Sequence, residues 1–353
     1  MVAHGEKINI KILISPLDWG LGHATRCIPI IRILLRKGCH VIVAASGFSQ
    51  ILLQQEFPQI EFVHIDGYNI QYRKKNILLG LIMQLPRFFN SIKKENKWLK
   101  KTIDQYQING VISDNRYGLY STKIPCVFIT HQLQVKSPTA FQWVEGSTRK
   151  QLYKFINRFN ECWIPDMADE NNCLAGSLSH PHTFPAIPVR YIGWLSKFEK
   201  ATIVEKKYIV TICLSGPEPQ RTLLEEIILP QLQNIEGDVL LIRGMPGKAS
   251  LPKVSSHIKV VNHLSTPDME RAFLQSQFII SRSGYSTLMD MQVLQCKCIF
   301  IPTPGQTEQE YLGKLLSEKK MAIVKSQEGF NLADALKEAA SFSFPFLHTY
   351  SND

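Results

Sequence analysis

Short apolar runs alternate with amphipathic stretches along most of the chain. The runs are continuous and rich in β-branched residues, which is typical of parallel strands buried on both faces of a sheet. We predict strands at residues 10–15, 40–44, 60–65, 110–113, 126–130, 162–165 and 191–193. A second set follows at residues 208–214, 238–243, 258–261, 278–281, 298–301 and 322–324.

Helical patterns lie between these strands, at residues 23–36, 220–232, 268–275, 286–294 and 308–318. Because strands and helices alternate in two blocks, we predict an α/β protein with two Rossmann-like, doubly wound domains. The alternation breaks near residues 193–202, which separates an N-terminal domain (1–195) from a C-terminal domain (196–353). The aromatic tail at 341–353 is expected to pack back onto the second domain.

The composition agrees with two folded domains. A length of 353 residues suits two domains, and 44% hydrophobic against 20% charged residues argues against disorder. The chain starts without the apolar stretch of a signal peptide, and no apolar run approaches the roughly 20 residues of a membrane-spanning helix. The eight cysteines form no Cys-x-x-Cys pair, so we expect a protein of the reducing cytosol without a metal site.

The net charge of +10 is distributed unevenly. Residues 1–195 carry 23 lysines and arginines against 13 acidic residues, whereas residues 196–353 carry 17 of each. The whole basic excess therefore lies in the N-terminal half. We expect the N-terminal half to bind an anionic partner and the C-terminal half to have a different function.

One basic segment, residues 73–101, holds nine basic residues against a single acidic residue, and apolar residues lie between them. Such a surface suits anionic lipid, and a peripheral place at the inner face of the membrane is our first hypothesis. The side chains predicted to meet lipid are Arg73, Lys74, Lys75, Phe88, Phe89, Lys93, Lys94 and Trp98. A long helix with its apolar side on the core and a solvated basic side explains the same pattern. Nucleic acid ranks last and is not predicted as a partner.

The first candidate site follows the first predicted strand. Gly20 and Gly22 allow a close approach of backbone and ligand before a helix begins. The positive end of that helix dipole favours a neutral imidazole at His23, which can then act as a general base. Arg26 lies on the same face and could hold a phosphate. The alternative is a tight turn with solvated side chains. The loop matches neither a dinucleotide fingerprint nor a P-loop.

Two loops of the C-terminal half offer anion sites at helix N-termini. Ser215 and Gly216 follow the first strand of that half. Further on, Arg282, Ser283 and Gly284 follow a strand, and the free N–H groups there suit a diphosphate.

Ser286 and Asp290 lie on one face of the helix that begins after Gly284. A carboxylate at Asp290 suits the hydroxyl groups of a ribose, and the alternative is a solvated helix residue. After the strand at 298–301, Gln309 could reach sugar hydroxyls. Thr307 and Glu310 form a predicted capping box, which gives Glu310 a purely structural alternative.

These residues together resemble the GT-B superfamily of nucleotide-sugar glycosyltransferases, and most closely the MurG-like members of glycosyltransferase family 28. The specific stretch runs from Arg282-Ser283-Gly284 through Gln309-Glu310-Tyr311 and is similar to the family's Arg-Ser-Gly…Glu…Gln-Gln-Tyr pattern. The glycines before His23 resemble the family's N-terminal Gly-Gly-His loop. Ser215 and Gly216 stand where the family has Ser-Gly-Gly, with Pro217 in place of a glycine.

The resemblance implies two domains facing across a cleft, with the donor on the C-terminal side and the acceptor on the N-terminal side. It implies that Asp290 holds the ribose and that Gln309 and Glu310 meet the donor sugar. Asp290 replaces the family's glutamate and Glu310 replaces its second glutamine, while Arg26 stands at a proline position. The donor sugar and the acceptor therefore stay open.

We accordingly expect an inverting, metal-independent glycosyltransferase that uses a UDP-sugar as co-substrate and needs no cofactor. Its acceptor hydroxyl could be lipid-linked. His23 is the first candidate for the base and Asp114 the second. The alternatives are an epimerase or hydrolase of UDP-sugars on the same fold, or a non-catalytic protein that binds membranes or nucleic acid.

Overall fold

The computed structural model describes residues 10–18, 20–68, 77–136, 145–199, 204–245 and 250–347, and for 77–86 only the helical backbone. The chain divides into two compact units. The first comprises residues 1–133, 146–165 and 181–195, and the second comprises 134–145, 166–180 and 196–353. The main division therefore falls after Leu195, and two short segments of the N-terminal half belong to the second unit.

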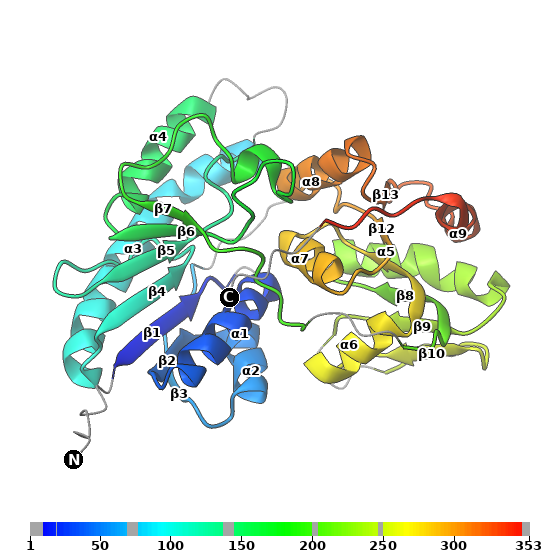
Figure 1. Ribbon diagram of the computed structural model, residues 1–353, viewed down its shortest axis with the longest axis horizontal. Coiled ribbons are helices and arrows are strands. Elements are labelled where there is room, and N and C mark those ends of the chain that lie inside the picture. Colours follow the sequence, from blue (N-terminus) through cyan, green and yellow to red (C-terminus); the bar gives the residue numbers. More distant parts are fainter. Residues whose placement is uncertain are drawn as a thin grey trace, which may run out of the picture. The chain divides into compact units, whose positions relative to one another are not determined.

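The first unit is built on a seven-stranded parallel sheet with the order β3-β2-β1-β4-β5-β6-β7 (Figure 1). Its strands are β1 (Lys11–Pro16), β2 (His40–Ala45), β3 (Glu61–His64), β4 (Gly110–Asp114), β5 (Cys126–Ile129), β6 (Glu161–Ile164) and β7 (Val189–Tyr191). Its helices are α1 (Leu21–Arg36), α2 (Gly47–Glu56), α3 (Ile77–Tyr106) and α4 (Glu145–Ile156).

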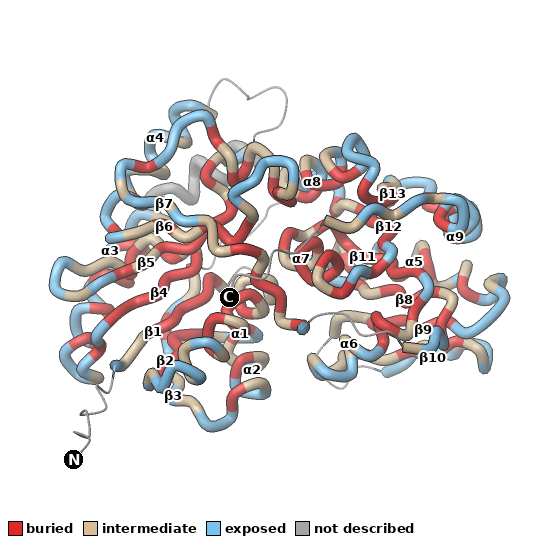
Figure 2. The backbone as a smooth tube through the Cα atoms, viewed as in Figure 1, coloured by how far each residue is buried: buried red, intermediate tan, exposed pale blue. Residues whose placement is uncertain are grey.

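Long-range packing holds α3 onto this sheet. Leu99 and Ile103 lie one turn apart on α3 and are buried in a core cluster with Leu13 of β1 and Phe128 of β5. The buried residues follow the strands of the sheet in Figure 2. The apolar side of the C-terminal part of α3 therefore packs in the core of the first unit.

The second unit is built on a six-stranded parallel sheet with the order β10-β9-β8-β11-β12-β13. Its strands are β8 (Tyr208–Cys213), β9 (Val239–Ile242), β10 (Ile258–Val261), β11 (Ser276–Ser281), β12 (Cys298–Phe300) and β13 (Ile323–Val324). Its helices are α5 (Gln220–Ile228), α6 (Thr266–Leu274), α7 (Tyr285–Val293), α8 (Thr307–Glu318) and α9 (Leu332–Ser341).

The two parallel sheets confirm the prediction of two Rossmann-like α/β domains. The tail after α9 packs onto the second unit, where Phe342 and Phe344 contact its core cluster and Phe344 lies 6.3 Å from Phe278 between ring centroids. No helix in the described part of the chain combines the length and the apolar character that crossing a bilayer requires.

Each sheet has one point at which the strand order reverses. In the first unit β1 lies between β2 and β4, and in the second β8 lies between β9 and β11. In open α/β sheets, ligands bind outside the carboxyl ends of the strands at this point. The candidate residues of both units lie at or after the ends of β1, β4, β8, β11 and β12, on this side of the two sheets.

Candidate active site

In the first unit, the loop after β1 brings the start of α1 to the end of β4. The backbone N–H of Leu17 donates to the carbonyl of Asp114 (3.0 Å), and Gly20 takes φ +96°, a value that favours glycine. Helix α1 then begins at Leu21, so His23 lies in its first turn. The predicted base and the second candidate, Asp114, are therefore neighbours at the switch point of the sheet.

His23, Arg26 and Asp114 form one hydrogen-bonded cluster. Nδ1 of His23 lies 3.1 Å from Oδ1 of Asp114, and Nε of Arg26 donates to Oδ2 of Asp114 (2.6 Å). A guanidinium N–H of Arg26 also donates to Oδ1, so the ion pair is bidentate. Asp114 is fully buried, whereas the His23 side chain keeps 17% of its surface exposed. Only the histidine of this pair can meet a substrate.

The charge of Arg26 controls the protonation state of Asp114. Burial alone would raise the pKa of this carboxyl, but the positive charge of Arg26, followed by His23 and their hydrogen bonds, lowers it to about 2. Asp114 is therefore an ionised acceptor that orients His23, and it is a poor proton acceptor itself. This geometry leaves His23 as the candidate base.

Arg26 lies in the interior rather than at the surface. Its side chain is 2% exposed and also donates from Nη1 to Nδ1 of His131 (2.9 Å). The sequence placed Arg26 in a phosphate-binding loop with Gly20 and Gly22, and the structure gives its guanidinium to protein partners instead. His131 was not among the predicted site residues. Its position just after β5, at the same edge of the sheet, could have identified it from the sequence.

In the second unit, the side chain of Arg282 hydrogen-bonds to several loops. From a site that is 1% exposed it donates to the carbonyls of Ile301 (3.2 Å), Pro302 (3.3 Å) and Gln220 (2.8 Å). It also donates to Oε1 of Gln327 (2.7 Å), and burial lowers its pKa to about 10. The predicted donor-site arginine therefore holds the loops after β12 and β13 against the start of α5.

Ser283, Gly284 and Gln309 come together as the motif predicts. Oγ of the buried Ser283 donates to the carbonyl of Gln309 (2.9 Å), and Gly284 precedes α7 as its N-cap. Oε1 of Gln309 accepts from the backbone N–H of Thr303 (2.9 Å). This bond turns the amide nitrogen toward Gly284, where it lies 4.0 Å from the position a β-carbon would take. The Gln309 amide thus faces the N-terminus of α7.

The capping box predicted for Thr307 and Glu310 is wrong in its register. The N-cap of α8 is Gln306, which makes no side-chain cap, and Thr307 is already helical. The exposed Glu310 accepts from the backbone N–H of Gly305 (2.8 Å). Its carboxylate still accepts from an amide that precedes the helix, so Glu310 has a structural role at an amide two residues before the predicted one.

Asp290 is buried rather than solvated. It is 8% exposed, and its Oδ1 accepts from Oγ of Ser196 (2.6 Å), a residue directly after the division between the units. Burial raises the pKa of Asp290 to about 6, although the charge of Lys197 opposes this shift. Ser286 lies one turn earlier on α7 and is half-buried. Ser196 and Lys197 had no signal in the sequence, because they are far from Asp290 along the chain.

Ser215 and Gly216, in the loop after β8, are both exposed. Gly216 takes φ +102°, and a β-carbon there would lie 3.6 Å from Oγ1 of Thr303. The loops after β8, β11 and β12 therefore present Gly216, Ser283, Gly284, Thr303 and Gln309 at the carboxyl edge of one sheet. This is where a doubly wound domain binds a nucleotide.

Residues 224–344 match the model of the glycosyltransferase family 28 C-terminal domain. A protein of Listeria monocytogenes serotype 4b, the UDP-N-acetylglucosamine–N-acetylmuramyl-(pentapeptide) pyrophosphoryl-undecaprenol N-acetylglucosamine transferase, is 24% identical over 347 residues. The match covers 93% of this chain and 89% of that protein. The chain therefore carries a family 28 C-terminal domain and is a glycosyltransferase. The alternative of a non-catalytic membrane or nucleic-acid binder is therefore wrong.

Solved structures of GT-B glycosyltransferases share the fold of this chain. MurG of Acinetobacter baumannii superimposes with a TM-score of 0.53 at 14% identity, over 94% of this chain and 90% of that one. The Arabidopsis thaliana enzyme UGT89C1, complexed with UDP-L-rhamnose, superimposes with a TM-score of 0.65 at 11% identity, over 96% and 90% of the two chains. At these identities the likeness shows the fold, and it confirms the predicted GT-B class.

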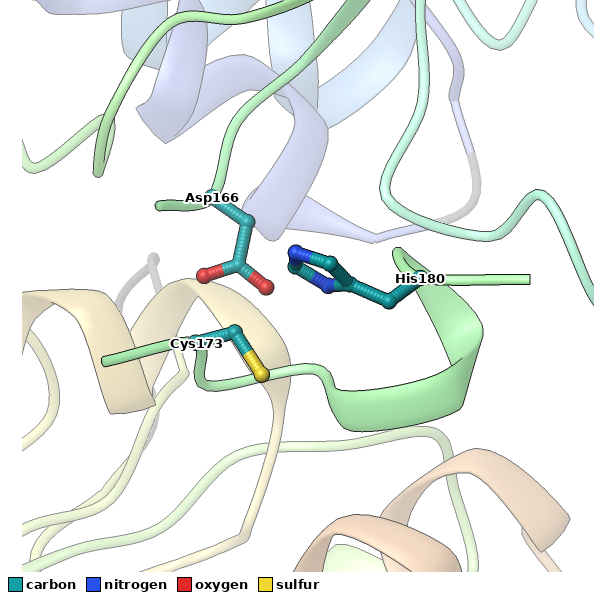
Figure 3. Close-up of side chains that lie close together, drawn as sticks. All are labelled: Asp166, Cys173 and His180. Carbon is teal, nitrogen blue, oxygen red and sulfur yellow. The ribbon is translucent and has the colours of Figure 1, made fainter. Parts of the chain in front are cut away.

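One group of metal-ligating side chains lies together in the described part of this glycosyltransferase. Ligand atoms of Asp166, Cys173 and His180 all lie within 4.8 Å of one another (Figure 3). Asp166 already accepts hydrogen bonds from three backbone amides and from Oγ of Ser179 (2.7 Å), which itself lies 2.9 Å from Nδ1 of His180. Burial raises the pKa of the Cys173 thiol. These groups hydrogen-bond within their own loop, at residues 166–180.

Helix α3 of the enzyme carries the basic segment on its solvated side. The exposed basic residues are Arg87, Lys93, Lys94, Lys97, Lys100 and Lys101. Phe88 is not on that side, since its ring stacks on Tyr68 at 5.4 Å between centroids and packs near Phe155. Trp98 contacts the core cluster, whereas Phe89 is 41% exposed. Phe88 and Trp98 therefore pack against other side chains of the first unit, and residues 73–75 lie outside the described residues.

Proposed function

We propose that this glycosyltransferase moves a hexose or N-acetylhexosamine from a UDP-sugar to an acceptor hydroxyl, with inversion at the anomeric carbon and without a metal ion. The Listeria relative is named for a UDP-N-acetylglucosamine donor and a pyrophosphoryl-undecaprenol acceptor, which supports a UDP-sugar and a lipid-linked acceptor. The sequence has no Asp-x-Asp motif of the kind that binds a metal with a nucleotide-sugar. The observation that carries the proposal is the contact between His23 and the buried, ionised Asp114.

His23 acts as the general base in this proposal. In the tautomer that carries its proton on Nδ1 and donates it to Asp114, the lone pair of Nε2 can accept the proton of the acceptor hydroxyl. The acceptor oxygen then attacks the anomeric carbon on the side opposite the diphosphate. The bond from that carbon to the phosphate oxygen breaks, and its electron pair leaves with UDP. The negative charge of Asp114 stabilises the imidazolium that forms.

The second unit holds the donor. Asp290 accepts hydrogen bonds from the ribose hydroxyls, and Gln309 donates its amide to the sugar. The backbone N–H groups at the start of α7, after Ser283 and Gly284, bind the diphosphate and stabilise its growing charge as it leaves. The exposed Ser215 and Gly216 supply further backbone contacts to the diphosphate.

The test of this proposal is acceptor-dependent release of UDP. Purified enzyme is incubated with UDP-N-acetylglucosamine, UDP-glucose or UDP-galactose, with and without a polyprenyl-pyrophosphate-linked N-acetylmuramyl peptide. We expect one donor to release UDP only when the acceptor is present, equally in EDTA, and NMR of the product should show the inverted anomer. Failure of every UDP-sugar to bind or react contradicts the proposal. Loss or inversion of the sugar without an acceptor instead favours a hydrolase or epimerase.

The basic face of α3 supports a peripheral place at an anionic membrane surface, at the inner face of the membrane. Lys93, Lys94 and Lys97 are exposed on successive turns, and each basic residue near anionic lipid contributes about 1 kcal/mol to binding. A lipid-linked acceptor lies in such a membrane, so this surface would bring the enzyme to its substrate. Sedimentation with phosphatidylglycerol vesicles tests the proposal, and equal binding to neutral vesicles contradicts it.

A further inference from the structure

The hydroxyl of Thr303 is buried and has no hydrogen-bond partner among the described residues. Thr303 follows β12, its side chain is 3% exposed, and its Oγ1 makes no hydrogen bond to any residue that the structure describes. The great majority of buried polar side-chain atoms have a partner, because desolvation without a hydrogen bond is costly. We therefore looked to a bound ligand as the hydrogen-bond acceptor of the Thr303 hydroxyl.

The glycine loop after β8 lies beside this hydroxyl. The position that a β-carbon on Gly216 would take lies 3.6 Å from Oγ1 of Thr303. Apart from the chain neighbours of Gly216, no other described atom lies within 4 Å of that position. Gly216 is exposed and follows β8, at the switch point of the sheet. A ligand atom that enters beside Gly216 can thus come within hydrogen-bonding distance of the hydroxyl.

The backbone of Thr303 links it to the sugar side of the donor site. Its N–H donates to Oε1 of Gln309 (2.9 Å), the bond that turns the Gln309 amide nitrogen toward Gly284. The hydroxyl of Thr303 therefore lies between the Gly216 loop, assigned to the diphosphate, and the side chain assigned to the sugar. In a nucleotide-sugar that spans these two groups, the phosphate that carries the sugar is the anionic group between them.

We propose that Oγ1 of Thr303 donates a hydrogen bond to the sugar-bearing phosphate of the donor, an assignment that rests on the proposed function. A hydroxyl is a good donor to an anionic phosphate oxygen, and the bond costs Thr303 no existing partner. The enzyme gains this contact with a nucleoside diphosphate but not with a nucleoside monophosphate. Thr303 is therefore a binding residue that selects for the second phosphate.

Calorimetric titration of Thr303→Val with UDP and with UMP tests the assignment. Valine keeps the shape and removes the hydroxyl, so we expect the Kd for UDP to rise about tenfold to a hundredfold, the range for a hydrogen bond to a charged group. The Kd for UMP should stay unchanged. Thr303→Ser keeps the hydroxyl and should bind UDP as the wild type does. Thr303→Ala is the second variant, and it should show the same loss of preference for UDP over UMP.

A matched control separates binding from folding. Thr211 is fully buried in β8, and its hydroxyl already bonds to Oγ of Ser276 (2.6 Å). Thr211→Val should therefore melt at a lower temperature and keep its affinity for UDP. Thr303→Val should melt no lower than the wild type, because the hydroxyl that it removes has no partner among the described residues.

The outcomes distinguish this assignment from the proposed function. A wild-type enzyme that binds UDP together with a Thr303→Val variant of equal UDP affinity overturns the role of Thr303 and leaves the proposed function intact. An equal loss of affinity for UDP and UMP also overturns it, because the hydroxyl would then not read the second phosphate. A wild-type enzyme that binds no UDP overturns the proposed function itself.

Discussion

The buried carboxyl of Asp290 should make the second unit less stable than a variant with a neutral side chain at this position. Asp290 is 8% exposed, and burial raises its pKa from 3.8 to about 6. At about 1.4 kcal/mol for each pKa unit, the ionised carboxylate costs the folded state about 3 kcal/mol. Asp290→Asn removes the charge and keeps an oxygen that accepts from Ser196. The variant should therefore be more stable than the wild type at pH 8.

The size of this gain depends on pH in a defined way. Above pH 6 the carboxyl is ionised in the folded and the unfolded chain, so the full cost of about 3 kcal/mol is present. Below pH 3.8 it is neutral in both states and the cost disappears. At pH 5 the unfolded chain is ionised and the folded chain mostly is not, which leaves about half of the cost. The advantage of Asp290→Asn should thus shrink by about half from pH 8 to pH 5.

Urea unfolding followed by far-UV circular dichroism measures this difference at the two pH values. The two units can unfold in separate steps, and the transition that UDP shifts to higher urea belongs to the second unit. Asp238→Asn, at an exposed site in the same unit, is the matched control and should change stability by less than about 0.5 kcal/mol. An advantage of Asp290→Asn that is equal at pH 5 and pH 8 would refute the reasoning, as would a loss of stability at pH 8.

Three further perturbations test other parts of the structure. His23→Ala should lower kcat about a hundredfold or more and leave the Kd for UDP unchanged; a variant with full kcat removes His23 as the base. Asp114→Asn should lower the unfolding free energy by about 3 kcal/mol, because Arg26 loses its buried counter-charge, and an unchanged urea midpoint contradicts that pairing. Lys93→Glu combined with Lys94→Glu should reduce sedimentation with phosphatidylglycerol vesicles, whereas Lys337→Glu, exposed on α9, should not.

The strands could be predicted because burial on both faces leaves a strong signal. The apolar runs located every strand that the structure describes. The largest difference is at β7 (Val189–Tyr191), where both bounds shift by two residues, and β11 begins two residues earlier than predicted. Strand β7 is at the sheet edge and only partly buried, so its pattern is weak. Helix α2 was not predicted. Its apolar residues Phe48 and Ile51 are exposed, so its sequence lacks a clear division into an apolar and a polar face.

Proline explains a further difference. The helix predicted at residues 220–232 ends as an α-helix at Ile228 and continues as a 3-10 turn from Leu229 to Asn234. Pro230 cannot donate the backbone hydrogen bond that a continuing α-helix requires. The pattern of apolar residues persists through both pieces, so periodicity alone does not reveal the change.

The sequence allowed prediction of those site residues that lie at or after the ends of buried strands. Loops that follow buried strands identified His23, Asp114 and Gln309 from the sequence. Contacts between residues far apart in the chain were beyond reach, and Ser196 and Asp290 are 94 positions apart. The pairing of Arg26 with Asp114, 88 positions away, likewise depends on tertiary structure and changes the role expected for that arginine.

The way in which Arg282 holds its neighbours bears on how the donor site can evolve. Three of its four hydrogen-bond partners are main-chain carbonyls, at Gln220, Ile301 and Pro302, and only Gln327 contributes a side chain. A carbonyl is present whatever amino acid occupies a position. The side chains of the loops around the proposed donor site can therefore change during evolution, and with them the sugar that the loops select. The same arginine meanwhile keeps the backbone in place. Libraries that randomise loop side chains and spare Arg282 and Gln327 should retain a high proportion of folded enzymes.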